Sequence, residues 1–330
     1  MSFMRRTQRQ ALLYALAAVG LWSTVATAFK LSLRYLRHAE LLFYAATVSL
    51  LLFGALLWRQ GRLGEAWRLA RRHPLRILLL GAINPFIYYL TLFHAYALLP
   101  AQEAQAINYS WGLLLAWLSV PILGHRLSRR EVLAGILCYL GVLVIATRGD
   151  LLGLHFHDIP GLLYALASTL LWALFWLFNT RLDAEPLPLL FLNFLVGVLL
   201  LSLYLLLGEG WRLPPWQGLA GALYVGLFEM GVTFLLWLKA MKLTHSTARI
   251  ANLIYLSPFL SLLFIHFIVG ERILPSTLVA LALILSGLAI QRKGGEITEE
   301  PRNRSTEEPI IRGTEEQRNR GVGRKRRFRH

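Results

Sequence analysis

The chain is poor in cysteine and in charge. Cys138 is the only cysteine among 330 residues, which excludes an intramolecular disulfide and a metal cluster built on cysteines. Charged residues make up 16% of the sequence, against about 25% in ordinary soluble domains. No Gly-x-x-x-x-Gly-Lys-Ser/Thr loop and no recognisable nucleophile–base motif is present, so nothing indicates ATP hydrolysis or catalysis. We expect no catalytic residue and no cofactor.

Apolar residues occupy most of the sequence instead. They make up 56% of it, with a mean hydropathy of +0.52. A helix needs about 20 residues to cross the hydrocarbon core of a bilayer. The apolar runs predict ten membrane-spanning helices near 11–33, 39–58, 76–98, 102–123, 131–147, 159–179, 187–207, 218–238, 249–269 and 275–291. The predicted class is an all-α, multi-pass membrane protein that contacts lipid.

Basic residues in the short loops predict the orientation of the spans. Lys and Arg are enriched in the loops on the cytoplasmic side. With the N-terminus inside, twelve loop Lys or Arg fall inside and six outside. The inside set is Arg59, Arg62, Arg68, Arg71, Arg72, Arg76, Arg126, Arg129, Arg130, Arg181, Lys239 and Lys242. Ten crossings then place both termini in the cytoplasm.

The two ends of the chain differ from its apolar middle. Residues 1–10 carry three Arg ahead of a stretch too long for a signal peptide, so we expect a short cytoplasmic N-terminus and a first span. Residues 292–330 contain twelve Lys or Arg and seven Glu, which predicts a disordered cytoplasmic tail. The net charge of +16 is spread over loops and tail, and we expect no nucleic acid as a partner.

The sequence contains an internal repeat. Leu12–Ala17 recurs as Leu162–Ala167, and in each copy a Trp follows at the same spacing. Two further landmarks recur in the same order: Leu41–Phe43 as Leu189–Phe191, and Gly124–Leu127 as Gly270–Ile273. Each copy holds five predicted spans, one over 11–148 and one over 159–291. Because five is odd, the second copy enters the membrane from the opposite side, the inverted repeat of many secondary transporters.

These residues resemble the drug/metabolite transporter superfamily in its duplicated EamA-type form. The resemblance covers residues 10–291 and includes Gly270-Glu271-Arg272-Ile273, its counterpart Gly124–Leu127 with His125 in place of Glu, and Ser257-Pro258. Asn108-Tyr109-Ser110-Trp111 is similar to a motif of the aromatic amino-acid exporter branch, with Gly112 where that motif has Pro. The resemblance implies export of a small metabolite across the inner membrane, driven by the solute gradient or by a coupled ion such as a proton.

Polar side chains in the middle of spans are candidates for a substrate site, because such groups are costly in lipid and usually face a cavity. Glu229 lies near the middle of its span, and the alternatives for it are a ligand for a substrate amine, a proton-coupling group or a structural hydrogen-bond partner. Its repeat equivalent falls at or next to Asn84. Asn108 and Asn193 either join helices or contact substrate.

Aromatic side chains complete the expected site. Trp22 and Trp172 are repeat-related and lie about half-way along their spans, and packing explains them as well as a cavity that binds a planar solute does. Other aromatics within spans include Tyr89. We expect the substrate-binding set to be Glu229, Asn84, Tyr88, Asn108, Tyr109, Trp111, Trp22, Trp172, Trp176, Asn193 and Tyr255. The sequence His155-Phe156-His157-Asp158 lacks further clustered ligands, and we expect no metal.

The leading hypothesis is a secondary transporter that exports aromatic or other neutral amino acids by alternating access through a cavity between the repeats. One alternative keeps the fold and changes the cargo to a drug, a nucleoside or another metabolite. A second is a membrane-embedded enzyme or a sensor without transport. Two five-helix repeats form a complete unit, which predicts a monomer or a loose dimer.

Overall fold

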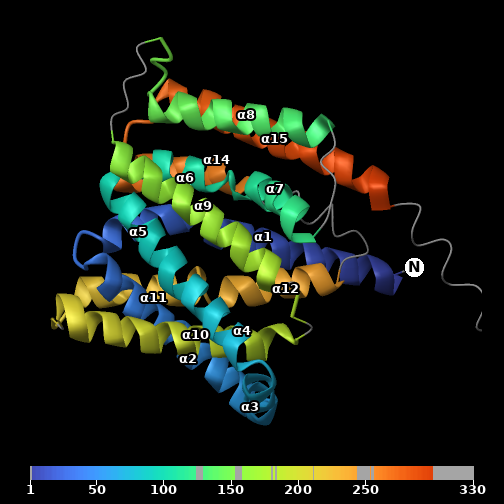
Figure 1. Cartoon of the computed structure of the whole chain (residues 1–330), viewed down its shortest axis with the longest axis vertical. Helices are drawn as coiled ribbons and strands as arrows, with labels where there is room; N and C mark the ends of the chain where they lie inside the picture. The colour runs from blue at the N-terminus through green and yellow to red at the C-terminus, as the bar shows by residue number, and fades with distance from the viewer. Residues whose placement is uncertain are drawn as a thin grey trace, which may run out of the picture.

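The computed structural model describes residues 2–123, 129–152, 158–179, 181–182, 184–210, 212–243, 253 and 256–299. Within these ranges the chain is helical and has no strand, which confirms the predicted all-α class. The helices form one bundle, with α8 and α15 at one side and α2 and α10 toward the other (Figure 1).

Among the described residues, six apolar helices are long enough to cross a membrane. They cover Gln8–Ser32, His38–Arg59, Pro74–Leu98, Ile159–Asn179, Pro186–Gly208 and Trp216–Trp237. Each begins and ends within three residues of a predicted span. Val132–Ala146, Leu256–Val269 and Pro275–Ile290 are shorter apolar helices at three further predicted spans. The uninterrupted elements are α1 (Ser2–Ser32), α2 (His38–Arg59), α8 (Arg129–Ala146), α9 (Ile159–Asn179), α10 (Pro186–Tyr204), which continues as η2 (Leu205–Glu209), and α15 (Pro275–Glu299).

The third span is broken in its middle. A π-helical segment, η1 (Ala82–Ile87), separates α4 (Pro74–Gly81) from α5 (Tyr88–Leu98). Inside η1, Asn84 has an extended backbone with φ −140° and ψ 119°. Pro85 explains the break, because its ring keeps the preceding residue out of the helical region and it has no N–H to donate.

The predicted eighth span is broken at the corresponding place. Residues 229–231 form a turn between α11 (Trp216–Phe228) and α12 (Val232–Leu243). The backbone N–H groups of Glu229 and Met230 both donate to the carbonyl of Val225, at 2.9 and 3.3 Å. The Thr233 hydroxyl donates to the Phe228 carbonyl, so a side chain satisfies a group that the turn leaves without a helical partner.

The fourth span is also interrupted. The sequence predicts one helix over 102–123, whereas the structure has α6 (Ala101–Asn108) and α7 (Trp111–Leu123) with a turn at Tyr109–Ser110. In the second repeat, α14 (Leu256–Phe264) continues as the π-helical η4 (Ile265–Val269). Helix α15 extends to Glu299, beyond its predicted end at 291, because an existing helix is extended at little cost.

A helix that the hydropathy pattern did not predict is α3 (Leu63–Arg72), between α2 and α4. Its apolar residues Leu63, Ala66, Trp67 and Ala70 recur at the i, i+3, i+4, i+7 spacing of one helix face. At 10 residues it is too short to cross a bilayer. A helix this short and this basic does not form a long apolar run in the sequence, so hydropathy does not predict it.

The two predicted repeats interlock. Helix α1 packs against α12 and α14 of the second repeat, and its counterpart α9 packs against α5 and α7 of the first. The second helices of the repeats, α2 and α10, also contact each other. Each repeat therefore completes its packing with helices of the other repeat.

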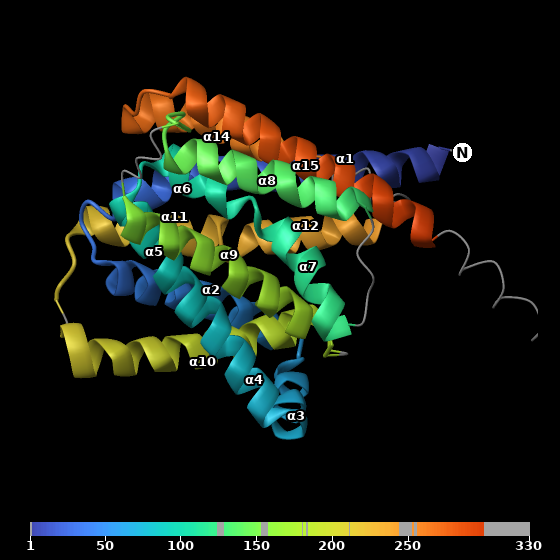
Figure 2. The same cartoon turned by 45° about the horizontal axis from the view of Figure 1, so that its top comes forward.

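Helices α8 and α15 pack against each other and lie side by side in both views (Figures 1 and 2). A Cβ at Gly141 would lie 2.8 Å from the carbonyl oxygen of Ala280, and a Cβ at Gly287 would lie 2.7 Å from that of Ala134. Gly141 and Ala134 precede Gly287 and Ala280 by the same 146 residues. The contact is therefore self-complementary and antiparallel, like the interface of a two-fold dimer.

Candidate functional site

Glu229 contacts the opposite repeat through a tyrosine. It is half-buried where α11 ends, and the Tyr89 hydroxyl donates a hydrogen bond to its Oε1 at 3.1 Å. Tyr89 is 1% exposed and lies on α5, just after the break of the third span. The pair therefore links the two broken spans, one from each repeat.

A row of aromatic rings extends from this pair. Tyr88 lies 4.6 Å from Tyr89 between ring centroids and stacks on Trp172 of α9 at 4.6 Å and 27°. Trp172 meets Trp111 edge-to-face at 6.4 Å and Trp176 edge-to-face at 5.8 Å. These rings come from α5, α7 and α9, so the predicted residues Tyr88, Trp111, Trp172 and Trp176 form one contact group with the Glu229–Tyr89 pair. Offset and edge-to-face rings offer faces on which a further ring can stack.

The turn between α6 and α7 brings two further predicted residues to this group. The Asn108 side chain lies beside Tyr88, and its Nδ2 donates a hydrogen bond to the Ser168 hydroxyl at 3.3 Å. The Tyr109 hydroxyl lies near the side chains of Ser257 and Gln105. Hydroxyl, amide and carboxylate groups therefore surround the rings, which suits a solute with both a planar apolar part and a polar part.

Asn84 and Asn193 lie together at the first break. A Cβ at Gly81 would lie 2.8 Å from the Asn193 carbonyl oxygen, and a Cβ at Gly197 would lie 2.4 Å from Cγ of Pro85. Asn84 is 3% exposed and Asn193 is fully buried. Within the described part of the chain, Asn84 Oδ1 and both polar side-chain atoms of Asn193 have no hydrogen-bond partner. Such groups cost about 1–3 kcal/mol each when unpaired, so they favour any ligand or water that reaches them.

The predicted residue Trp22 lies in a different ring group. Trp22 contacts Phe234 at 6.0 Å and Trp237 at 5.4 Å, both on α12, and makes no ring contact with Trp172. Tyr255 lies outside the described residues.

Hydrogen bonds link the two repeats where the N-terminus of α6 meets the segment before α15. The Glu271 carboxylate accepts the backbone N–H of Ala101 at 2.9 Å, at the N-terminus of α6. Gln102 donates from Nε2 to the Arg272 carbonyl and accepts from the Leu274 N–H and from the Thr277 hydroxyl. The residue Glu271 of the repeated signature therefore caps a helix of the other repeat, where its charge is favoured by the helix dipole. His125, its counterpart in the first repeat, lies outside the described residues.

Tyr89, Ser168 and Ser257 were missed as site residues by sequence reasoning. Tyr89 is one of the aromatic residues within the predicted spans. It lies about one turn after Asn84-Pro85, and Asn84 falls at or next to the repeat equivalent of Glu229, so the sequence did offer a signal for Tyr89. The serines carried no such signal, because Ser in a membrane helix commonly bonds its own backbone, as Ser168 does to the Ala165 carbonyl at 2.7 Å. In the described ranges, no group of three or more His, Cys, Asp or Glu could hold a metal ion. His155 and His157 lie outside those ranges.

Long apolar helices with polar groups buried between them define a multi-pass membrane protein with an internal polar site. The family comparison makes the class specific: the model of the EamA-like transporter family matches residues 9–147 and 159–291. The chain belongs to the EamA-like transporter family. Family membership identifies it as a membrane transporter rather than an enzyme.

Two relatives and one solved structure extend this result. An aromatic amino acid exporter, YddG, of Ancylobacter novellus is 26% identical over 295 residues, covering 86% of this chain and 97% of the relative. An uncharacterized protein of Pseudomonas aeruginosa is 28% identical over 211 residues, covering 64% of this chain and 71% of the relative. A crystal structure matches with a TM-score of 0.63 and 24% identity over 88% of this chain and 98% of its own, which supports the fold.

Proposed function

We propose that this protein exports aromatic or other neutral amino acids as a secondary transporter, by alternating access at a site between two inverted repeats. The observation that carries the proposal is the Glu229–Tyr89 pair, which joins the two broken spans beside the row of rings. The likeness to an aromatic amino acid exporter supports the same substrate class.

The proposed architecture has ten crossings, with both termini in the cytoplasm. It consists of a cytoplasmic N-terminus (1–10), two five-helix repeats (11–148 and 159–291) and a charged cytoplasmic tail (292–330). The antiparallel, self-complementary contact between α8 and α15 supports inversion. In a membrane, two antiparallel helices at equivalent places of the two repeats cross in opposite directions.

In the proposed site, Glu229 binds the substrate ammonium group and the rings of Tyr88, Trp111, Trp172 and Trp176 stack on its side chain. Asn84, Asn108, Asn193 and Tyr109 offer hydrogen bonds to its polar groups. In this proposal Trp22 belongs to the ring group on α12, and Tyr255 also contacts the substrate. A carboxylate that binds an amine and is released from it is also suited to coupling with a proton.

The interlocked repeats suit alternating access. In this proposal, the Glu271 and Gln102 hydrogen bonds are the contacts that hold one end of the bundle closed. Opening that end requires these hydrogen bonds to break, and an inverted repeat offers a second packing of nearly equal energy in which the other end closes. The solute gradient or a coupled proton supplies the driving force.

The experiment is a counterflow assay with purified protein in liposomes. Labelled tryptophan, phenylalanine and threonine are compared with a nucleoside and a sugar, and empty liposomes serve as the blank. The proposal predicts saturable counterflow that is largest for the aromatic amino acids. Absence of saturable flux for every amino acid would refute the substrate class, and flux of the nucleoside alone would establish the alternative cargo.

A further inference from the structure

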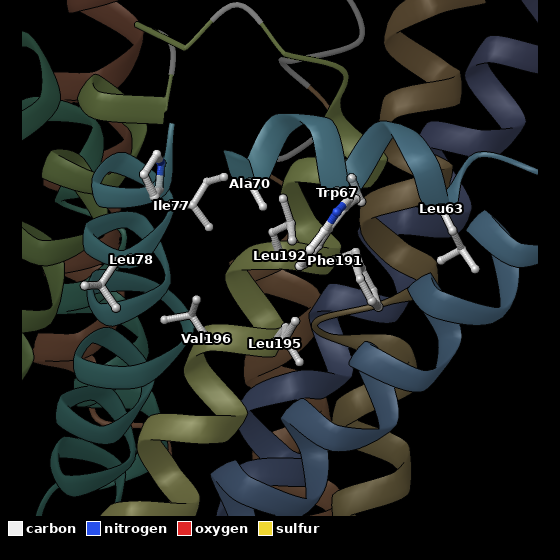
Figure 3. A pocket seen from close by; sticks show the side chains of 11 residues that line it. Leu63, Trp67, Ala70, Ile77, Leu78, Phe191, Leu192, Leu195 and Val196 are labelled. Atoms are coloured by element: carbon white, nitrogen blue, oxygen red, sulfur yellow. The ribbon is translucent and has the colours of Figure 1, made fainter. Parts of the chain in front are cut away.

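An apolar pocket lies between α3, α4 and α10, away from the candidate site. Its volume is about 360 Å³. Trp67 and Ala70 from α3, Ile77 and Leu78 from α4, and Leu192 and Leu195 from α10 line it (Figure 3). Figure 3 shows these side chains converging beneath the short helix α3. All six are apolar, so the pocket fits a hydrocarbon chain and lacks groups that would hold an amino acid.

The surface on and beside α3 is strongly basic. Arg59, Arg68, Arg71, Arg72 and Arg76 are all exposed on or beside α3, and none forms an ion pair with a residue that the structure describes. Arg71 is the closest link to the pocket, because its Cζ lies 5.1 Å from the ring centroid of Trp67.

One acidic side chain lies on the same helix. Glu65 pairs with Arg62 at 2.7 Å, and this hydrogen bond holds the pKa of the Glu65 carboxyl below its ordinary value. Glu65 therefore stays ionised at neutral pH, where it pairs with Arg62 and also attracts Arg68. The five exposed arginines form no described ion pair and are available to an anionic partner.

From this combination we infer that the pocket binds an anionic phospholipid, with an acyl chain against α4 and α10 and the headgroup phosphate on the arginines of α3. Charge complementarity selects this occupant, because five exposed arginines without a described ion pair lie on or beside α3, and one of them, Arg71, lies against the pocket residue Trp67. Trp67, which is 61% exposed, supplies the amphipathic ring that is enriched where hydrocarbon meets headgroups. The acyl chain of a zwitterionic phospholipid fits the pocket equally well. Its headgroup, however, has no net negative charge to attract the arginines.

The site is distinct from the proposed substrate site but shares a helix contact with it. Val196 lines the pocket, and a Cβ at Gly81 would lie 2.6 Å from its Cβ. Gly81 precedes the break at Asn84 on the same span. A lipid in the pocket therefore packs against the helix pair that holds the first break.

Fluorescence quenching by brominated lipids tests the inference. Wild type and Trp67→Phe are reconstituted in phosphatidylcholine vesicles that contain the same small fraction of brominated phosphatidylglycerol or brominated phosphatidylcholine. The difference between the two proteins isolates the signal of Trp67. We expect the anionic lipid to quench Trp67 at a several-fold lower fraction than the zwitterionic lipid, with a preference that falls as salt rises.

Two kinds of variant separate the contribution of the lipid headgroup to binding from that of the acyl chain. Arg71→Gln is expected to reduce the anionic preference by about fivefold, the effect of one basic side chain near an anionic surface. Ala70→Leu fills the pocket and is expected to reduce quenching by both lipids, whereas Ala55→Leu, at an exposed position of α2, is the matched control. Equal quenching of the wild type by the two lipids, or a full preference in folded Arg71→Gln, would overturn the inference. Gel filtration and circular dichroism establish the fold of each variant.

Discussion

The third helix of one repeat and that of the other break at equivalent places and carry different chemistry there. In the first, Pro85 opens the helix and leaves the Asn84 amide buried without a described partner for its oxygen. In the second, no proline is present, and the turn at Glu229 places a half-buried carboxylate on Tyr89 of the other repeat. The two helix breaks therefore present different side chains: a neutral amide in the first repeat and a carboxylic acid in the second.

The frame around the two breaks is nearly symmetric. A Cβ at Gly81 would meet the Asn193 carbonyl and Val196, and a Cβ at Gly226 would meet the Ala45 carbonyl and Val48. Gly226 follows Gly81 by 145 residues, and Asn193 and Val196 follow Ala45 and Val48 by 148. Duplicated contacts maintain the packing, and the side chains that differ between copies are free to specialise for the solute.

The largest effect is expected at the glycines between α8 and α15. Gly141→Ala and Gly287→Ala each place a methyl group within 2.8 Å of a backbone oxygen, and overpacking of this kind costs about 1–3 kcal/mol. Thermal melting in detergent should show similar losses for both. Gly20→Ala is the control, because a Cβ at Gly20 has no atom within 4 Å. If one glycine tolerates Ala and its counterpart does not, the two-fold contact is wrong.

A smaller effect is expected at the repeat-related tryptophans. Trp172 joins the Tyr88 and Trp111 rings, so Trp172→Leu should raise the KM for tryptophan counterflow by about three- to tenfold, the effect of one aromatic pair. Trp22→Leu, on the other ring group, should change that KM less. Equal changes would show that the two groups line one continuous site.

The smallest effect is expected at the closed end. Glu271→Gln keeps an acceptor for the Ala101 N–H and removes a charge from the N-terminus of α6, which weakens the contact by about 0.3–1 kcal/mol. Hydrogen exchange of the amides of residues 101–104 should become about two- to fivefold faster. Glu65→Gln, in the surface pair on α3, is the control and should leave that exchange unchanged. Unaltered exchange in Glu271→Gln would remove Glu271 from the closed end.

Most of the helical frame was predictable, because long apolar runs have one solution in a membrane. Six spans were placed within three residues of their ends. The interruptions were harder to predict. Pro85 indicates the first, whereas no proline marks the turns at Tyr109 and Glu229, and hydropathy does not register them. Helix α3 was not predicted because its ten amphipathic residues are too few and too polar to resemble a membrane span.

The site was predictable in part for the same reason. Polar and aromatic residues deep in spans stand out, and Tyr88, Trp111, Trp172 and Trp176 do contact one another in a group that reaches Glu229 through Tyr89. Which residue faces which depends on the crossing of helices that are distant in sequence. The separation of Trp22 from Trp172 follows from that crossing and could not be read from their equivalent positions.

The most direct test is tryptophan binding to the purified protein, measured for wild type, Glu229→Gln and Asn84→Ala. A charge-assisted hydrogen bond contributes about 1.5–3 kcal/mol, so Glu229→Gln should weaken binding at least about tenfold while the protein stays folded. Asn84→Ala should weaken binding less, since the amide lacks the charge. Wild-type affinity in folded Glu229→Gln would contradict the proposal that the second break carries the substrate site.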